Sequence, residues 1–257
     1  MLVFLSGSEP DSAKQRLKEN TMENLPSLEE MLKAGMHFGH RTSKWHPKMA
    51  PYIFSSRNGV HILNLTKSKQ LLKQALVVLE QAASEGKTIL LVGSKTQVKT
   101  VLKESALACN MPYVNEGWLG GTITNFAIIR KAIRKYKDLL AERDGGKLDK
   151  YTKKERLQID REINRLDKKV GGLVNLNKAP DIMFIWDIKE EKTALAEAKK
   201  CGITVVAVCD TNVNPQNVDY VIPANDDASK TISMILGLIS VSIKQGVEHI
   251  GQKPQNK

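Results

Sequence analysis

The sequence predicts an α/β fold built on a parallel β-sheet that helices cover on both faces. Short segments that are apolar along their whole length alternate with segments of helical periodicity. A strand that is apolar at every position is buried on both sides, which is typical of parallel sheets. Two further patterns add to this plan: a hairpin signal near the N-terminus and a pair of long helices in mid-chain.

The N-terminal elements are predicted by capping and turn residues. Ser27 and Glu30 have capping-box spacing, which predicts a short helix that Gly35 ends. Strand-like runs at Tyr52–Ser56 and Val60–Leu63 flank Asn58-Gly59. Both turn residues tolerate a positive φ, so this dipeptide predicts a tight β-hairpin that extends from the body of the protein.

The alternating part of the chain begins with a helix over Thr66–Ala83, whose apolar residues recur at helical spacing. The strands we expect after it are Thr88–Val92, Tyr113–Val114, Ile182–Trp186, Thr204–Val208 and Tyr220–Ile222. The helices we expect run from an N-cap at Ser94 to Ala108, over Lys189–Lys200, and from Asp226-Asp227 to about Gln245.

Two helices interrupt this alternation and carry the spacing of a coiled-coil seam. The seam residues are Ile129, Ile133, Tyr136 and Leu140 on the first helix and Ile159, Ile163, Leu166 and Val170 on the second. Thr152 begins a capping box for the second helix. Gly120-Gly121 precedes the pair and Gly171-Gly172 follows it, which indicates an antiparallel coiled-coil hairpin entered and left through glycine hinges.

These patterns divide the chain into a body, an insertion and two tails. We expect the α/β domain to comprise residues 25–122 and 173–246, with the coiled-coil hairpin at 123–172. Residues 1–24 are predicted to be a disordered tail, because most of them are too polar to be buried in a core. Residues 247–257 are predicted to be a flexible C-terminal tail. Met22, just ahead of the predicted fold, is a candidate initiator.

The distribution of charge indicates a polyanionic partner. The chain carries a formal net charge of +11. Residues 31–79, which we call the acid-free segment, hold eight Lys and Arg and no Asp or Glu. Residues 126–172 hold fifteen Lys and Arg against eight Asp and Glu. A surface without carboxylates suits a nucleic acid, because an acid there would repel phosphate.

We therefore predict that these two segments bind RNA, with cations for phosphates and flat side chains for bases or riboses. The candidate residues are Arg41, Lys44, Trp45, His46, Lys48, Arg57, Lys67 and Lys69 in the acid-free segment, and Arg130 and Arg134 in the hairpin. The competing interpretation of the hairpin is a solvated surface on which its acids form ion pairs with its bases.

No metal or cofactor is implied by the residues. His37, His40 and His46 lie close in sequence, but no Cys, Asp or Glu stands near them to complete a zinc site. We interpret seven residues as structural instead: His37, Gly39, His40, Asn58, Gly59, Gly120 and Gly121.

Enzyme signatures are also missing. The turn after Thr88–Val92 has a single glycine, Gly93, where a phosphate-binding loop needs several. Asp187 and Asp210 follow strands, as catalytic acids of α/β enzymes do, but without a paired base we interpret them as capping residues. We therefore expect no catalytic activity. An α/β nucleotide-binding enzyme and a free RNA-binding regulator remain the alternatives to a structural RNA-binding protein.

The three cysteines, Cys109, Cys201 and Cys209, form no C-x-x-C pair, which favours a reducing compartment over a disulfide framework. The longest apolar run, from Ile232 to Ile243, is too short to span a bilayer. We expect an intracellular protein with neither a membrane nor DNA as a partner.

Several motifs together resemble one known family. They are Leu28-Glu29-Glu30-Met31-Leu32-Lys33-Ala34-Gly35-Met36-His37-Phe38-Gly39-His40, Trp45-His46-Pro47-Lys48-Met49, Arg57-Asn58-Gly59-Val60-His61-Ile62, Gly117-Trp118-Leu119-Gly120-Gly121-Thr122-Ile123-Thr124-Asn125, Gly171-Gly172, Pro180-Asp181-Ile182, Asp210-Thr211-Asn212 and Ile222-Pro223-Ala224-Asn225-Asp226-Asp227. In this order they resemble the universal small-subunit ribosomal protein family S-two, in its bacterial form. The resemblance covers roughly residues 25–246; residues 1–21 have no counterpart, and Thr204 replaces a common Pro.

This resemblance implies a Rossmann-like α/β domain with an inserted coiled-coil hairpin. It also implies a non-enzymatic component of the cytoplasmic ribosome that binds small-subunit rRNA between head and body on the solvent side. The expected protein partners are neighbouring small-subunit proteins, among them the mRNA-binding protein S-one, which such proteins help to dock.

Overall fold

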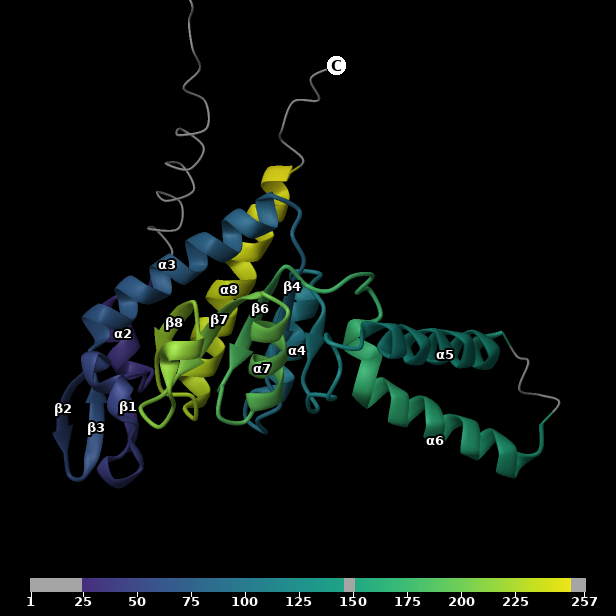
Figure 1. Ribbon diagram of the computed structural model, residues 1–257, viewed down its shortest axis with the longest axis horizontal. Coiled ribbons are helices and arrows are strands. Elements are labelled where there is room, and N and C mark those ends of the chain that lie inside the picture. The colour runs from purple at the N-terminus through teal and green to yellow at the C-terminus, as the bar shows by residue number, and fades with distance from the viewer. Residues whose placement is uncertain (1–24, 146–150, 251–257) are drawn as a thin grey trace, which may run out of the picture.

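The computed structural model describes residues 25–145 and 151–250 (Figure 1). The tail predicted at 1–24 lies outside these residues, as do residues 251–257 of the tail predicted at 247–257. The body contains a five-stranded sheet in the order β5-β4-β6-β7-β8, in which every neighbouring pair is parallel. Its strands are β4 (Ile89–Val92), β5 (Tyr113–Val114), β6 (Ile182–Trp186), β7 (Thr204–Cys209) and β8 (Tyr220–Pro223). The predicted parallel sheet is confirmed.

Successive residues of each central strand pack into different cores, because strand side chains alternate between the two faces of a sheet. Leu91, Phe184 and Val206 belong to one core. Their neighbours Leu90, Met183 and Val205 belong to the other. The first core is completed by α3 (Leu65–Ser84), α4 (Lys99–Ala108) and α8 (Ser229–Ile250), and the second by α7 (Lys192–Lys200) and the base of the hairpin. The expectation that both faces are covered is therefore correct.

A second, three-stranded antiparallel sheet lies at one end of the body (Figure 1). The predicted hairpin forms its β2 (Ile53–Arg57) and β3 (Val60–Leu63), joined at Asn58 and Gly59 with φ of 51° and 74°. The sequence did not predict β1 (Phe38–Arg41), which pairs with the other edge of β3. Short 3₁₀ helices η1 (Thr42–Lys44) and η2 (Pro47–Tyr52) connect β1 to β2. Before β1, α2 (Leu28–Lys33) carries the predicted capping box.

Three predicted helix boundaries differ from the structure. Helix α4 begins at Lys99 rather than after Ser94, because both the side chain and the backbone N–H of Ser94 bind the carboxylate of Glu191. Helix α7 begins at Lys192, after a turn in which Asp187 accepts a hydrogen bond from the backbone N–H of Lys189. Helix α8 continues to Ile250, so residues 247–250 are helical rather than part of the predicted tail.

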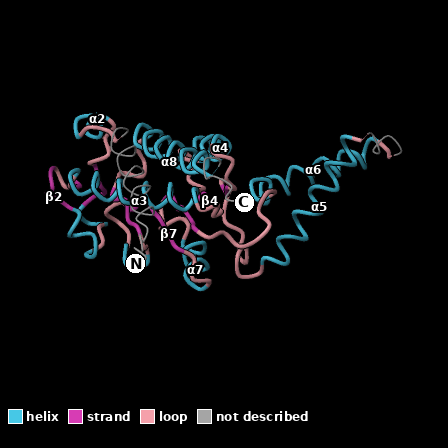
Figure 2. Tube along the Cα trace, turned by 90° about the horizontal axis from the view of Figure 1, so that it is seen from above, coloured by secondary structure: helices cyan, strands magenta, loops and turns pink. Residues whose placement is uncertain are grey.

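The two inserted helices, α5 (Phe126–Asp144) and α6 (Lys153–Val170), pack together and project from the end of the body opposite the three-stranded sheet (Figures 1 and 2). The buried residues between them come from the predicted seam: Ile129, Ile133, Tyr136, Ile163, Leu166 and Val170. The capping box at Thr152 is present. At the base, the hydroxyl of Tyr136 donates to the Asp167 carboxylate at 2.6 Å and ties one helix to the other.

Candidate nucleic-acid interface

The cations of the acid-free segment lie mainly on the three-stranded sheet and its connections. Arg41, Lys44, Lys48 and Arg57 are exposed, and none forms an ion pair within the described residues. Arg41 on β1 and Arg57 on β2 are both registered opposite Val60 of β3. Directly paired residues share one face of an antiparallel sheet, so the two guanidinium groups are presented on the same side. Exposed cations of this kind can bind the phosphates of a nucleic-acid backbone.

Other candidates in this segment also have structural roles. His46 caps η2, since its Nδ1 accepts from the backbone N–H of Lys48 at 3.2 Å. The backbone N–H of His46 donates to the backbone carbonyl of Thr211 at 2.8 Å. The Lys67 ammonium donates to the carbonyl of Pro51 at 2.7 Å. Trp45 packs against His61 with the two rings tilted and their centroids 5.1 Å apart, and the Trp45 side chain stays partly exposed. Lys69 is half-buried.

Two exposed aromatic side chains on the same sheet were not among the candidate binding residues predicted from the sequence. The Phe54 side chain is 74% exposed and the Phe38 side chain 49%. Phe54 lies where the β2–β3 register shifts, between Ile53 and Ser55. Such a bulge redirects a side chain away from regular alternation. A phenylalanine this exposed, in a region without acids, is typical of a binding surface.

The hairpin carries the second group of cations. Arg130 and Arg134 are exposed, lie one turn apart on α5 and have no ion-pair partner among the described residues. Lys135 and Arg165 instead share Glu162, each with a closest N–O distance of 2.7 Å. Hydrogen bonds from Arg165 and Lys135 lower the pKa of Glu162 to about 2. Part of the hairpin surface is thus neutralised internally, as the competing interpretation proposed.

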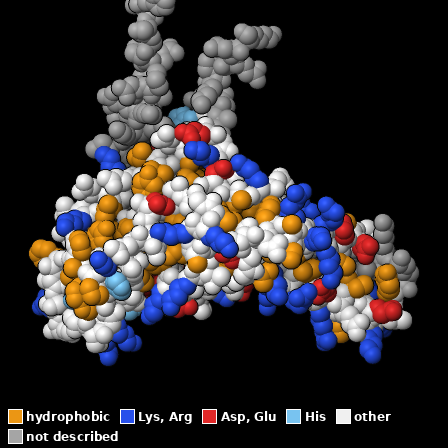
Figure 3. Space-filling view, viewed as in Figure 1, with side chains coloured by type: hydrophobic (Ala, Val, Ile, Leu, Met, Phe, Trp, Pro, Cys, Tyr) orange, Lys and Arg blue, Asp and Glu red, His pale blue; other side chains and the backbone are white. Residues whose placement is uncertain are grey.

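The predicted RNA-binding residues therefore form two separate surfaces at opposite ends of the molecule rather than one patch. Figure 3 shows Lys and Arg side chains gathered over the projecting helices, and others at the end that carries the three-stranded sheet. A partner that contacts both must be as long as the body.

The predicted structural motif attaches β1 to the body. At Gly39, a Cβ atom would lie 2.5 Å from the Thr211 side chain, so only glycine permits this approach. The backbone N–H of His40 donates to the Thr211 hydroxyl at 2.8 Å. The ring of His37 packs on Phe38, with centroids 4.0 Å apart, and burial lowers the pKa of His37. These contacts support the structural interpretation of all three motif residues.

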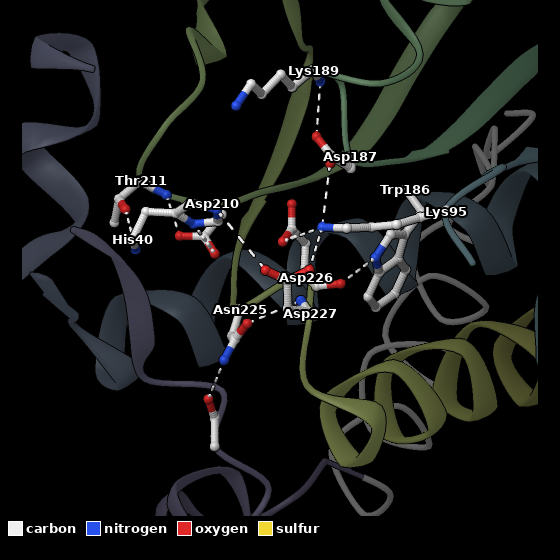
Figure 4. A network of polar contacts seen from close by, with 11 residues as sticks. His40, Lys95, Trp186, Asp187, Lys189, Asp210, Thr211, Asn225, Asp226 and Asp227 are labelled. Carbon is white, nitrogen blue, oxygen red and sulfur yellow. Dashed lines mark hydrogen bonds and ion pairs between the residues drawn. The ribbon is translucent and has the colours of Figure 1, made fainter. Parts of the chain in front are cut away.

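His40 also enters a polar network at the carboxyl end of the parallel strands (Figure 4). Its Nδ1 lies 3.0 Å from a carboxylate oxygen of Asp210, whose hydrogen bond raises the pKa of His40. Asp210 therefore does more than cap a turn, which corrects our interpretation of it. Burial, reinforced by the charges of Asp187 and Asp210, raises the pKa of Asp226 to about 7.

Lys95 lies between three carboxylates of the same network. Its ammonium is 2.6 Å from Asp227, 2.9 Å from Asp226 and 3.5 Å from Asp187. Burial opposes the lysine charge, but the hydrogen bonds from Asp227 and Asp226 outweigh it and raise the pKa of Lys95. The chain's own ammonium thus occupies the edge of the sheet at which α/β proteins commonly bind ligands.

One part of this network has the donor set of a metal site. His40, Asp210 and Asp226 each offer a ligand atom, and these atoms lie within 4.8 Å of one another. One imidazole and two carboxylates suit a transition metal such as zinc. Sequence reasoning rejected a metal because no acid stands near His40 in the chain. The fold brings in two acids from more than 160 residues away, so distance along the chain does not decide which ligands are available to His40.

The turn after β4, where a nucleotide-binding enzyme would bind phosphate, is filled by the chain's own side chains. A Cβ at Gly93 would lie 2.9 Å from both Leu102 and Trp186, so this glycine is needed for packing. The backbone N–H of Ser94, which could bind a phosphate, donates to the buried Glu191 carboxylate at 2.9 Å. Asp187 accepts from the backbone N–H of Lys189, as the capping interpretation predicts.

Comparison with known proteins identifies the family. The family model described as ribosomal protein S2 matches residues 31–246. The chain belongs to the ribosomal protein S2 family.

Curated relatives are similar in sequence to this chain over most of their length. The chain is 44% identical over 234 residues to the small ribosomal subunit protein uS2 of Flavobacterium johnsoniae, covering 91% of this chain and 92% of the relative. It is 47% identical over 216 residues to uS2 of Chlorobaculum tepidum, covering 84% and 87%. The S2 family consists of ribosomal proteins rather than enzymes. Within the described ranges, no helix combines the length and apolar character needed to cross a bilayer.

Proposed function

We propose that this chain is a structural protein of the small ribosomal subunit and binds small-subunit rRNA through two surfaces. One is the exposed part of the acid-free segment around Arg41, Lys44, Lys48 and Arg57. The other is the outer face of α5 around Arg130 and Arg134. We place the bound protein at the junction between the head and the body of the small subunit, as the family resemblance implies.

The observation that carries this proposal is the exposed, unpaired state of the cations in the acid-free segment. Cations that hold the fold together have acidic partners, as Lys95 does. Arg41, Lys44 and Lys48 have none among the described residues, and the segment contains no acid that could approach them. An unscreened cationic surface gains affinity by releasing counterions from a nucleic acid.

Sedimentation of tagged protein in sucrose gradients tests the proposal. The full chain is expected to sediment with small subunits at moderate salt, whereas a free RNA-binding regulator would stay near the top. Substituting Arg41, Lys44 and Lys48 with Glu should abolish co-sedimentation without unfolding the chain. The matched control substitutes the exposed Lys192, Lys200 and Lys230 with Glu, which makes the same change in charge elsewhere. Equal incorporation of both triple variants would contradict the proposal.

The exposed aromatic surface supports a further role in docking protein S-one. Phe54 and Phe38 lie beside the proposed rRNA surface, and solvent-exposed aromatic side chains favour binding of a protein partner. Phe54→Ala is expected to leave incorporation into subunits intact while reducing the S-one content of those subunits. Leu107→Ala is the control, because Leu107 is a comparably exposed apolar residue on α4. Normal S-one content in the Phe54→Ala particles would exclude this docking surface.

A further inference from the structure

The start of the hairpin is held by one carboxylate from a distant helix. Glu197 lies on α7, and its side chain is only 7% exposed. Its Oε1 accepts from the indole N–H of Trp118 at 3.0 Å and from the backbone N–H of Gly121 at 2.7 Å. Its Oε2 accepts from the backbone N–H groups of Ile123 and Thr124 and from the Thr124 hydroxyl, at 3.0 to 3.1 Å. Five donors from residues 118–124 thus converge on one side chain.

The geometry requires an ionised carboxylate at this position. A carboxylate only accepts hydrogen bonds, and both of its oxygens face N–H or O–H groups. Burial opposes ionisation of Glu197, yet the hydrogen bonds from Trp118 and the three backbone groups outweigh it and hold the pKa below its usual value. A glutamine at this position could accept hydrogen bonds only through its single amide oxygen, because its NH₂ group would face the remaining N–H and O–H donors.

Glu197 connects the start of the hairpin to the core of the body. Its helix buries Ala194, Leu195 and Ala198 in the core beneath the parallel sheet. The loop that it binds ends at Asn125, immediately before α5, and Asn125 provides no side-chain cap for that helix. Gly121 adopts a φ of +89°, which lets the loop turn its N–H groups toward the carboxylate. The loop held by Glu197 thus leads directly into α5.

The end of the hairpin is held by close packing. A Cβ at Gly172 would collide with the backbone carbonyl of Tyr113 in β5, so the chain returns to the body in direct contact with the sheet. The glycines that flank the hairpin were interpreted as hinges. Gly121 and Gly172 instead lie in positions that fix the chain.

We propose that Glu197 is a positioning residue that fixes the orientation of the α5–α6 hairpin, so that the two basic surfaces meet one rRNA as a preformed interface. The second half of this inference rests on the proposed function. Two contact surfaces joined rigidly bind with a higher effective concentration than two joined loosely, provided that their geometry matches the partner. Without Glu197 the hairpin should still form but point in many directions.

Electron–electron distance measurements on the free protein test the positioning role. One spin label replaces Asp138 on α5 and the other replaces Glu104 on α4, in a Cys201→Ser background that removes the exposed thiol. The native side chain should give one narrow distance distribution. Glu197→Gln should broaden it, while Glu190→Gln, an exposed residue just before α7, should not. Labels at Asp138 and Gln158, both in the hairpin, should keep their distance in every variant.

A milder variant keeps the test decisive if Glu197→Gln fails to fold. Trp118→Phe combined with Thr124→Val removes two of the five donors and leaves the carboxylate and the backbone contacts. Intermediate broadening is expected. A distribution as narrow as that of the native chain in either folded variant would overturn the positioning role.

Binding to small subunits prepared without this protein tests whether rRNA binding needs the fixed orientation of the hairpin. Glu197→Gln should bind roughly tenfold more weakly, and its affinity should depend less steeply on salt, because fewer phosphates are contacted at once. Loss of folded protein alone would lower binding by the same factor at every salt concentration. A broadened distance distribution with unchanged affinity and salt dependence would overturn the claim that rRNA needs the fixed orientation. Failure of the native chain to bind would instead contradict the proposed function, and the distances would still report on Glu197.

Discussion

Replacing Gly93 by alanine separates a packing role of the β4–α4 turn from a ligand-binding role. A Cβ at this position would lie 2.9 Å from Leu102 Cδ1 and from Trp186 Cβ, and 3.2 Å from Val98 Cγ1. Unstrained carbon contacts are about 3.5 to 4.0 Å. The end of the leucine can move aside, but the Cβ of Trp186 is fixed to the central strand β6. Overpacking of this kind costs about 1–3 kcal/mol.

Urea unfolding followed by circular dichroism gives the required comparison. Gly93→Ala should lower the free energy of unfolding by that amount. Gly120→Ala is the control, because no atom lies within 4 Å of its added Cβ and its φ is not positive. It should be neutral or stabilising by up to about 1 kcal/mol, since alanine restricts the unfolded chain. In a nucleotide site, Gly93 would make room for a pyrophosphate and alanine would leave the free protein unaffected. Equal stability of the two variants, or micromolar ATP binding that Gly93→Ala abolishes, would refute the packing argument.

Three further predictions concern the hairpin. Ile163→Ala should lower the free energy of unfolding by about 2–4 kcal/mol, because Ile163 is 2% exposed, whereas Leu157→Ala, at a 51% exposed site, should change it by less than about 0.5 kcal/mol in urea melts. The stability advantage of the native chain over Glu197→Gln should be complete above about pH 4.5, the ordinary pKa, and disappear in melts as the pH falls through the lowered folded pKa. Replacing residues 126–169 with a Gly/Ser linker should preserve the circular dichroism of the α/β body while weakening subunit binding; global unfolding would contradict it.

Features specified by neighbouring residues were predictable from the sequence. Asn58-Gly59 determines its own turn, and the seam of α6 follows from the spacing of its own apolar residues. The strand β1 was missed because it has only four residues and its middle pair, Gly39 and His40, resembles no strand pattern. It exists because β3 pairs with it and because Thr211, 171 residues away, accepts from the backbone of His40.

The candidate site likewise combines features that neighbouring residues determine with features that depend on residues distant in the chain. An absence of acids is a property of a continuous segment, so composition alone indicated the first basic surface. The approach of Asp210 and Asp226 to His40 depends on the order of strands in the sheet, which no local pattern encodes. Glu197 looks in the sequence like any exposed helical glutamate. Its role became visible only when the loop over 118–124 was seen to fold against it.

The placement of the acids explains how the fold presents a strongly basic exterior. Among the residues that the structure describes, six carboxylates are buried: Glu80, Asp187, Glu191, Glu197, Asp210 and Asp226. Five of these acids, Asp187, Glu191, Glu197, Asp210 and Asp226, bind groups of the chain itself: backbone N–H groups, the indole of Trp118, the Lys95 ammonium or the His40 imidazole. No lysine or arginine is buried to the same degree in the described residues. Because buried acids act inside the body while cations remain outside, the surface is more positive than the formal charge of +11 implies. The interactions that stabilise the fold thus also leave the exterior suited to a polyanion.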